Sequence, residues 1–196
     1  MVIVYQLADL VGTGVKSIAR NFQAKIAISD SQLLNRAKDG DDTAFNELVC
    51  RHQNFIYKLA WGYLNEKEAA KDATQDVFIK AYQGLPYFQS DSQFTTWLYR
   101  ICKNHCLNLL RRQKRESELE LDRPNNTESD LPMKLGLKKM IANLSEEYRE
   151  IIILRYYQDL KYDQIARLLD IPLSTVKIRL HRAKAELKNL AGVGSK

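Results

Sequence analysis

Apolar residues recur at three- and four-residue intervals along most of the chain from Asp30 onward. This spacing places them on one face of a helix, because an α-helix has about 3.6 residues per turn. No segment alternates apolar and polar residues as a half-buried strand does, and no hairpin signal lies between two alternating segments. The pattern therefore predicts an all-α protein.

The helical pattern has one long interruption, at residues 116–134. Its ESELELDRPNNTESDLPM segment holds six carboxylates against Arg123 as the only cation, and Pro124 and Pro132 break it further. This composition is typical of a solvated tether. We therefore expect two small helical domains, residues 30–115 and 135–191, joined by a flexible acidic linker.

Residues 1–29 fit neither domain. Gly12 and Gly14 disfavour a stable helix, and Asp9 interrupts an apolar stretch that no basic segment precedes. No part of the chain approaches the roughly 18 apolar residues of a membrane span. We expect a flexible N-terminal extension, not a signal peptide, and no membrane insertion.

Cysteine is sparse, with Cys50, Cys102 and Cys106 only. An odd, low count argues against a disulfide framework and fits the reducing cytoplasm. Cys102, His105 and Cys106 lie close together on one predicted helix, but no further cysteine is near enough to complete a metal site. Packed core residues are the favoured interpretation, and no metal or other cofactor is expected.

Residues 162–187 have the layout of a helix-turn-helix. Pro172 cannot continue the first helix, and Ser174 can cap the second. Asp170 occupies a turn position where Gly is usual, and Asp adopts the left-handed conformation more readily than most residues.

The second of these helices carries cations on most of its surface, in a chain whose net charge is +6. With Val176 and Leu180 buried, its polar face suits the major groove of DNA, and a thymine methyl is a fitting contact for Ile178. A solvated basic helix is the alternative, but the matching turn and first helix favour DNA binding. The residues expected to contact double-stranded DNA are Ser174, Thr175, Lys177, Ile178, His181 and Arg182.

A helix predicted from Asn65 to about Gln83 has an acidic exposed arc. Asp72 and Asp76 are four residues apart, a spacing at which like charges cost a few tenths of a kcal/mol. Such an arc, edged by apolar residues, suits a protein partner that brings Arg or Lys, although a merely solvated acidic face is the alternative. The residues on or beside the arc are Asp72, Gln75, Asp76, Phe78 and Ile79.

The helix predicted from Phe94 to about Arg115 contains no acidic residue. Aromatic side chains among cations are what single-stranded nucleic acid needs, because the rings stack on bases and the cations bind the backbone. Trp97 and Ile101 are expected in the core, whereas Phe88 and Phe94, near the preceding loop, are candidates for stacking.

Three segments, in this order, resemble the extracytoplasmic-function (ECF) group of bacterial sigma factors. They are DATQDVFIKAY, FTTWLYRICKNHCLNLLRRQKR and LSEEYREIIILRYYQDLKYDQIARLLDIPLSTVKIRLHRAKAEL. The resemblance covers about residues 30–190. It implies two domains, one that binds core RNA polymerase and opens the minus-ten element, and one that reads the minus-thirty-five element.

The resemblance also implies particular contacts. The acidic helix would bind the clamp helices of the beta-prime polymerase subunit, and many ECF sigma factors are controlled by an anti-sigma factor. A base flipped out of the melted minus-ten element would be captured at the loop and basic helix, where stacking must recover a cost of a few kcal/mol. The residues assigned to minus-ten DNA are Phe88, Phe94, Thr95, Thr96, Trp97, Arg100, Lys103, Asn104, Arg111 and Arg112.

Two other classes of protein were weighed. A helix-turn-helix regulator that does not bind polymerase shares the C-terminal unit, but it has no evident use for the acidic helix or the aromatic and basic helix. An enzyme is disfavoured, because the chain contains no P-loop, GxGxxG, HExxH or GxSxG motif.

Overall fold

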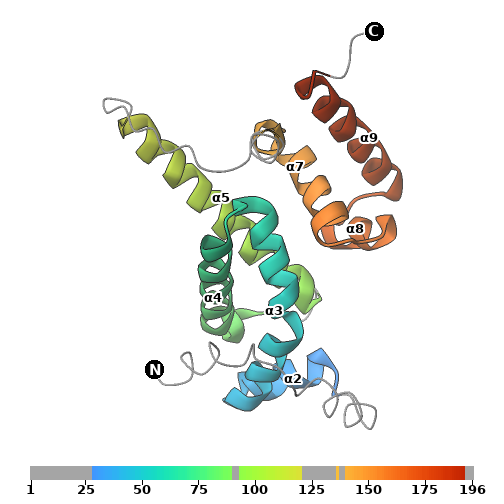
Figure 1. Ribbon diagram of the computed structural model, residues 1–196. Helices are drawn as coiled ribbons and strands as arrows, with labels where there is room; N and C mark the ends of the chain where they lie inside the picture. The colour runs from blue at the N-terminus through green and yellow to red at the C-terminus, as the bar shows by residue number, and fades with distance from the viewer. Residues whose placement is uncertain (1–27, 90–92, 121–135, 137–139, 193–196) are drawn as a thin grey trace, which may run out of the picture.

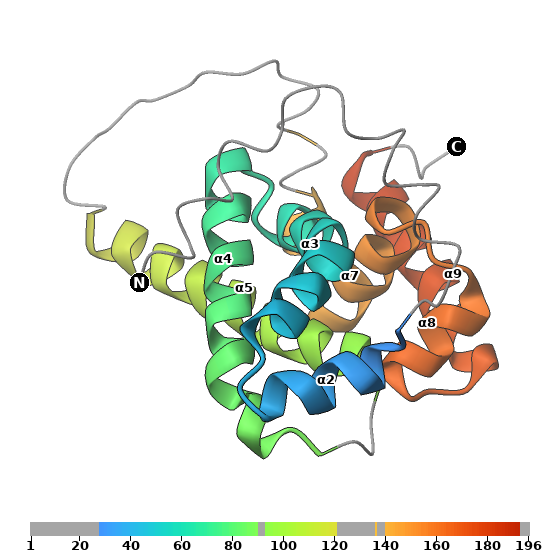
Figure 2. The ribbon, with the colours of Figure 1, turned by 90° about the horizontal axis from the view of Figure 1, so that it is seen from below.

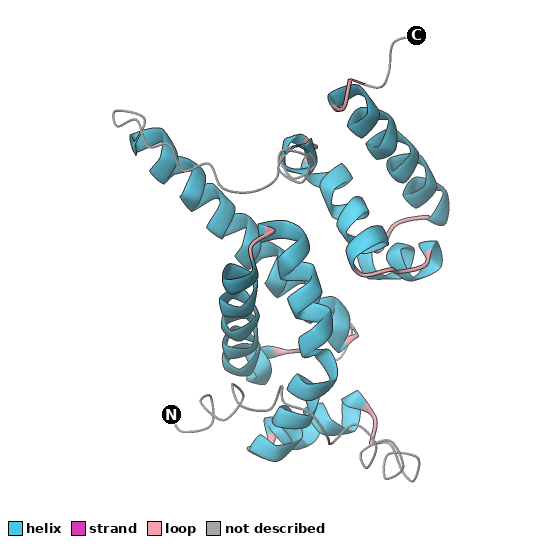
Figure 3. Cartoon of the chain, in the orientation of Figure 1, coloured by secondary structure: helices cyan, strands magenta, loops and turns pink. Residues whose placement is uncertain are grey.

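The computed structural model describes residues 28–89, 93–120, 136 and 140–192 (Figure 1). All regular elements in these ranges are helices, which confirms the all-α prediction (Figure 3). The predicted extension, apart from residues 28 and 29, and the linker from residue 121 onward lie outside the described residues. No helix in the described ranges is both long and apolar enough to cross a membrane.

The first domain contains four α-helices and a short 3-10 turn. They are α2 (Asp30–Lys38), α3 (Asp42–Leu64), α4 (Lys67–Gly84), η2 (Leu85–Tyr87) and α5 (Phe94–Glu120). Ser29 begins α2 with a capping box, and the Asp41 carboxylate caps α3 by accepting hydrogen bonds from the N–H groups of Thr43 and Ala44. The Asp41 cap lies in the turn that joins α2 to α3.

The junction between α3 and α4 corrects the prediction that Asn65 begins a helix. Asn65 instead ends α3 in the left-handed conformation, with φ of 55°. Glu66 is the N-cap of α4, and its carboxylate accepts hydrogen bonds from the N–H groups of Glu68 and Ala69. Asn is one of the few residues other than Gly that ends helices in this conformation, so it closes one helix and leaves the capping to its neighbour.

Helix α5 runs five residues further than its basic segment predicts. Residues 116–120, assigned to the linker from their acidity, continue the helix to Glu120. Glu and Leu are good helix formers, so negative charge alone does not end the helix.

The second domain is a helix-turn-helix preceded by three helical segments. Residues 140–143 are helical, followed by α7 (Glu146–Ile152), the π-helical segment η3 (Ile153–Tyr157), α8 (Tyr162–Leu169) and α9 (Leu173–Leu190). Asp170 ends α8 with φ of 54°, as its tolerance of the left-handed conformation predicts. Helix α9 begins one residue earlier than expected, with Pro172 at the N-cap position and no side-chain cap, so the prediction that Ser174 caps it was wrong.

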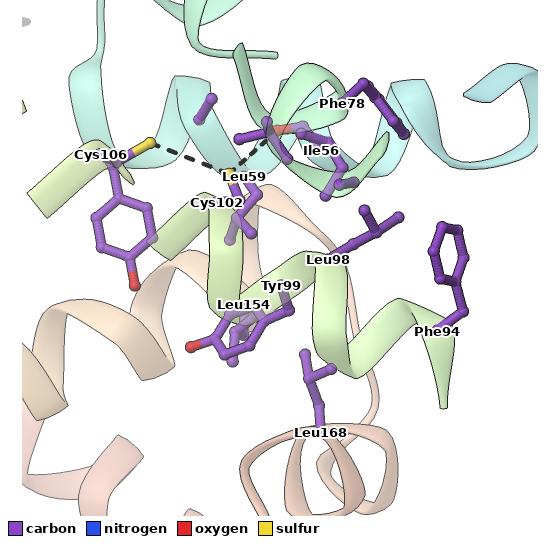
Figure 4. Packing of buried hydrophobic residues seen from close by; sticks show 14 of the residues in the cluster. Ile56, Leu59, Phe78, Phe94, Leu98, Tyr99, Cys102, Cys106, Leu154 and Leu168 are labelled. Atoms are coloured by element: carbon purple, nitrogen blue, oxygen red, sulfur yellow. Dashed lines mark hydrogen bonds between the residues drawn. The ribbon is translucent and has the colours of Figure 1, made fainter. Parts of the chain in front are cut away.

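The two domains pack against each other where α3 meets η3 (Figures 1 and 2). Ion pairs of Lys103 also join α5 to α7. The buried side chains of the two domains form one apolar cluster, in which Leu98 of α5 and Leu154 of η3 are both fully buried (Figure 4). The Gln158 side chain donates a hydrogen bond of 2.6 Å to the carbonyl oxygen of Phe55 in α3. The helix-turn-helix is therefore held on the first domain by contacts that the linker does not supply.

Gly62 allows α3 and η3 to approach closely. A Cβ atom at this position would lie 2.6 Å from Cγ2 of Ile153 and 3.3 Å from Cγ of Tyr157. Real Cβ atoms essentially never come within 3.0 Å of another heavy atom. Glycine is thus required by the contact between the domains and not by its backbone conformation.

We predict that Gly62→Ala lowers the free energy of unfolding by about 1–3 kcal/mol, the usual cost of overpacking a core. Urea titration followed by circular dichroism measures it. In the Ile153→Ala background the same substitution should cost much less, because the clashing Cγ2 atom is gone. An equal cost in both backgrounds would place the strain elsewhere.

Candidate nucleic-acid and partner interfaces

Helix α9 presents most of its predicted DNA-contacting residues to solvent. Val176, Leu180 and Ala183 are buried and fix the helix on the domain. The opposite face is exposed at Ser174, Lys177, Ile178, His181 and Arg182, and Thr175 is half-buried. Ile178 keeps 51% of its surface exposed, which is unusual for an isoleucine on a helix that already has an apolar stripe. This face can therefore enter a groove of DNA without repacking.

Helices α7 and α8 hold this face in place. Ile165 of α8 is fully buried, as its helical spacing predicts. Ala166 and Leu169, expected to point inward as well, are half-buried, and Leu168 is buried instead. Arg179 of α9 forms an ion pair of 3.1 Å with Glu147 of α7. Contacts with α7 and α8 therefore fix the helix that carries the exposed cations.

A second group of cations and aromatic rings lies beside α9 and was missed from sequence. The Lys184 ammonium lies 5.7 Å from the centre of the Tyr156 ring, and Arg155 lies 6.0 Å from the same ring. Tyr156 is 55% exposed. The sequence signal for this group was RYY, at residues 155–157. It was missed because the helical pattern alone assigns these residues to an ordinary α-helix.

Helix α4 exposes the acidic arc as predicted at Asp72, Gln75, Asp76 and Ile79. Ile79 is 43% exposed. Phe78 is the exception: only 7% of its surface is exposed, so it lies in the core and not beside the arc. The buried stripe is wider than periodicity indicates, because α4 packs on both α3 and α5.

The aromatic residues around the loop before α5 are mostly buried, contrary to the prediction that two of them offer free stacking faces. Phe88 and Phe94 are 5% and 4% exposed. Their rings pack with the half-buried ring of Trp97, and the Phe88 and Trp97 centroids are 4.8 Å apart. Lys38 closes the cluster by donating a hydrogen bond of 2.6 Å to the Phe88 carbonyl oxygen.

Tyr87 is the most exposed aromatic residue that the structure describes. Its side chain follows Pro86 in η2 and is 85% exposed. The sequence LPYF offers two adjacent rings, and only the tertiary structure decides which of them is buried.

The polar side of α5 carries the remaining predicted minus-ten residues. Arg100, Asn104, Arg111 and Arg112 are exposed, and Thr95 and Thr96 are half-buried. They share a helix but do not form a pocket with Phe88 and Phe94, whose rings point into the core.

Lys103 of α5 is already engaged by the second domain. Its Nζ atom lies 2.7 Å from Oε1 of Glu150 and 3.2 Å from Oε1 of Glu146, both on α7. Glu150 is 6% exposed and also accepts a hydrogen bond from the Tyr99 hydroxyl. Burial and the Glu150 carboxylate raise the pKa of Tyr99, so the hydroxyl remains a donor. In this arrangement Lys103 is not free to bind a phosphate.

Burial opposes the charge of Lys103, but its bonds to Glu150 and Glu146 outweigh that effect and raise its pKa. We predict that Lys103→Met lowers the free energy of unfolding by about 3 kcal/mol, because Glu150 would stay buried without its cation. Urea titration measures the loss. The double variant Lys103→Met/Glu150→Gln should recover part of it, since both charges are then absent. A loss unaltered by the second substitution would contradict the role given to the ion pair.

Cys102 and Cys106 are buried, and their Sγ atoms are 4.0 Å apart (Figure 4). The hydrogen bond with Cys106 and the burial raise the pKa of the Cys102 thiol, so it stays protonated. Among the residues that the structure describes, no group of three His, Cys, Asp or Glu side chains is placed to hold a metal ion.

Known protein families match the two domains separately. The family described as Sigma-70 region 2 matches residues 48–116, and Sigma-70, region 4 matches residues 134–187. The ECF RNA polymerase sigma-E factors of Escherichia coli K12 and Haemophilus influenzae are 34% and 33% identical over 180 residues. Each alignment covers 83% of this chain and at least 94% of the relative.

A solved structure of CnrH in complex with the cytosolic domain of CnrY has the same fold. It superposes with a TM-score of 0.61 and 28% identity, covering 85% of this chain and 99% of that one. The sigma factor RpoE of Bartonella quintana, solved with the anti-sigma factor NepR, is similar in fold with a TM-score of 0.55.

The two matched regions, one in each helical domain, make the chain a transcription initiation factor of the sigma-70 type. Within that class, the chain belongs to the ECF RNA polymerase sigma factors.

Proposed function

We propose that this sigma factor binds core RNA polymerase mainly through the exposed arc of α4, at the clamp helices of the beta-prime subunit. The observation that carries this proposal is the arc itself. Asp72, Gln75 and Asp76 face solvent next to the exposed Ile79, although the opposite side of the helix is fully packed. Carboxylates flanked by an apolar side chain suit a partner surface that carries Arg or Lys. Phe78 supports the arc from the core.

We further propose that α9 reads the minus-thirty-five element as double-stranded DNA and that α5 binds the melted minus-ten strand. The exposed cations and Ile178 of α9 support the first assignment, and the exposed Arg100, Asn104 and Arg111 of α5 support the second. Phe88 and Phe94 contribute by shaping the loop from inside the domain, because their rings are buried.

The proposed function places the protein in the cytoplasm, where polymerase and promoter DNA are found, and gives it no enzymatic activity. Control by an anti-sigma factor is part of the proposal. It is supported by the similarity of this chain to CnrH and RpoE, which were solved in complexes with CnrY and with the anti-sigma factor NepR. A helix-turn-helix regulator independent of polymerase is the alternative, and the exposed acidic arc argues against it.

The test is binding to purified bacterial core RNA polymerase, followed by transcription from genomic DNA fragments. We expect a tight complex and new, discrete start sites. Asp76→Arg should weaken core binding by about 100-fold or more, because a like charge at an interface costs several kcal/mol.

Glu68→Arg is the matched control, since it makes the same charge change on the same helix two turns earlier, at a residue whose side chain is 67% exposed. It should leave the affinity for core nearly unchanged. Folded protein that fails to bind core would leave the polymerase-independent regulator as the better account.

Removing two cations from α9 should weaken binding to a duplex that carries the minus-thirty-five element. Each phosphate contact contributes about 0.9 to the slope of log K against log salt concentration, so Lys177→Ala/Arg182→Ala should reduce that slope by about 2. Fluorescence anisotropy over a salt series measures it. Lys67→Ala/Lys71→Ala removes the same charge from the first domain and should leave the slope intact. A slope that the α9 variant does not change would show that these cations do not contact phosphates.

A further inference from the structure

His105 lies between the two helices to which the proposed function assigns polymerase and promoter binding. It belongs to α5, only 8% of its surface is exposed, and its ring reaches α4. Nδ1 lies 2.5 Å from the ammonium nitrogen of Lys80, and Nε2 lies 3.2 Å from Oδ2 of Asp76. No function described so far uses this buried ring.

These contacts determine where the ring carries its proton. The Lys80 ammonium can only donate, so Nδ1 must accept, and the hydrogen of the neutral ring then sits on Nε2. That hydrogen is on the side of Asp76. Nε2 has no aligned hydrogen bond in this arrangement, so its contact with the carboxylate is an electrostatic one.

The neutral form of the ring is favoured by its surroundings. Burial and the charge of Lys80 lower the pKa of His105 from its ordinary value, and they outweigh the opposite effect of Asp76. Lys80 and Asp76 are the charged groups that act on the ring from α4. The geometry and the pKa direction therefore agree on a neutral bridge near pH 7.

The position of the bridge matters because Asp76 and Lys80 are four residues apart on one helix. An acidic residue four positions before a lysine is well placed to form an ion pair with it. Both side chains are described here, yet each is directed to His105 and no ion pair joins them. The Asp76 side chain keeps 54% of its surface exposed. The ring thus binds the cation that would otherwise neutralise the carboxylate.

We propose that His105 is a positioning residue for polymerase binding. It holds Lys80 through Nδ1 and steadies Asp76 through Nε2, so that the Asp76 carboxylate stays available to a cation of the polymerase. This inference rests on the proposed function of Asp76. It also links two surfaces, because Asn104, adjacent to His105 on α5, faces the expected minus-ten DNA.

A double-mutant cycle tests the proposal by measuring affinity for core polymerase with the full-length protein. His105→Leu removes both ring nitrogens and should weaken binding about 5- to 10-fold, whereas His105→Asn keeps an acceptor near Nδ1 and should recover most of the loss. In the Asp76→Ala background, His105→Leu should have no further effect. His52→Asn, which removes the ring paired with Asp30 at 2.7 Å, is the control for losing a histidine from the same domain.

The cycle distinguishes failure of the proposed function of the arc from failure of the positioning role of His105. Asp76→Ala with unchanged affinity would overturn the proposed function of the arc. If Asp76→Ala lowers the affinity for core and His105→Leu lowers it further by its full single-variant factor, only the positioning role is overturned. A His105→Leu variant that folds and binds core normally would overturn that role as well.

Two further measurements detect the bridge in the folded wild-type protein. Nitrogen-15 NMR should show His105 as the Nε2–H tautomer, and an Nδ1–H ring would contradict the proposal. Protonation places a second N–H against Lys80 and a positive charge beside Asp76. Because the pKa of His105 is lowered, affinity for core should hold at the ordinary histidine pKa of about 6.5 and fall several-fold at more acidic pH. His105→Asn should flatten this pH dependence, and an unaltered profile would overturn the proposal.

Discussion

The arrangement of the two domains depends on one buried carboxylate. Glu150 of α7 receives Lys103 and the hydroxyl of Tyr99, both from α5, in a site with almost no exposure to solvent. A buried charge is tolerated only where its partners are fixed, so α5 and α7 must keep their register for the contact to exist. The apolar packing around Gly62 supplies buried surface between the domains, and the Glu150 carboxylate specifies how α7 aligns with α5.

Helix α5 carries the proposed minus-ten surface and also joins the two domains. One side of it packs on α3 and α4, another meets α7, and the side that carries Arg100 and Asn104 is left to solvent. Lys103, which the sequence assigned to minus-ten DNA, is paired with Glu150 and Glu146 of the second domain in this structure.

Local features were predictable from sequence, and features that depend on distant residues were not. The buried face of α4 follows from the spacing of Ala70, Ala73 and Val77, and the end of α8 follows from the tolerance of Asp170 for the left-handed conformation. Burial of Phe78 and Phe88 depends on helices that meet only after folding. The Lys103 to Glu150 pair joins positions 47 residues apart, and no local pattern signals it.

The distribution of the three thiols has a practical consequence. Cys102 and Cys106 are completely buried, and the raised pKa of Cys102 keeps its sulfur unreactive. Cys50 is exposed on α3. An alkylating dye should therefore attach to the native protein at a single position in the first domain. With one cysteine introduced on α9, the protein would carry one dye in each domain, and energy transfer between two dyes would measure the distance between the domains.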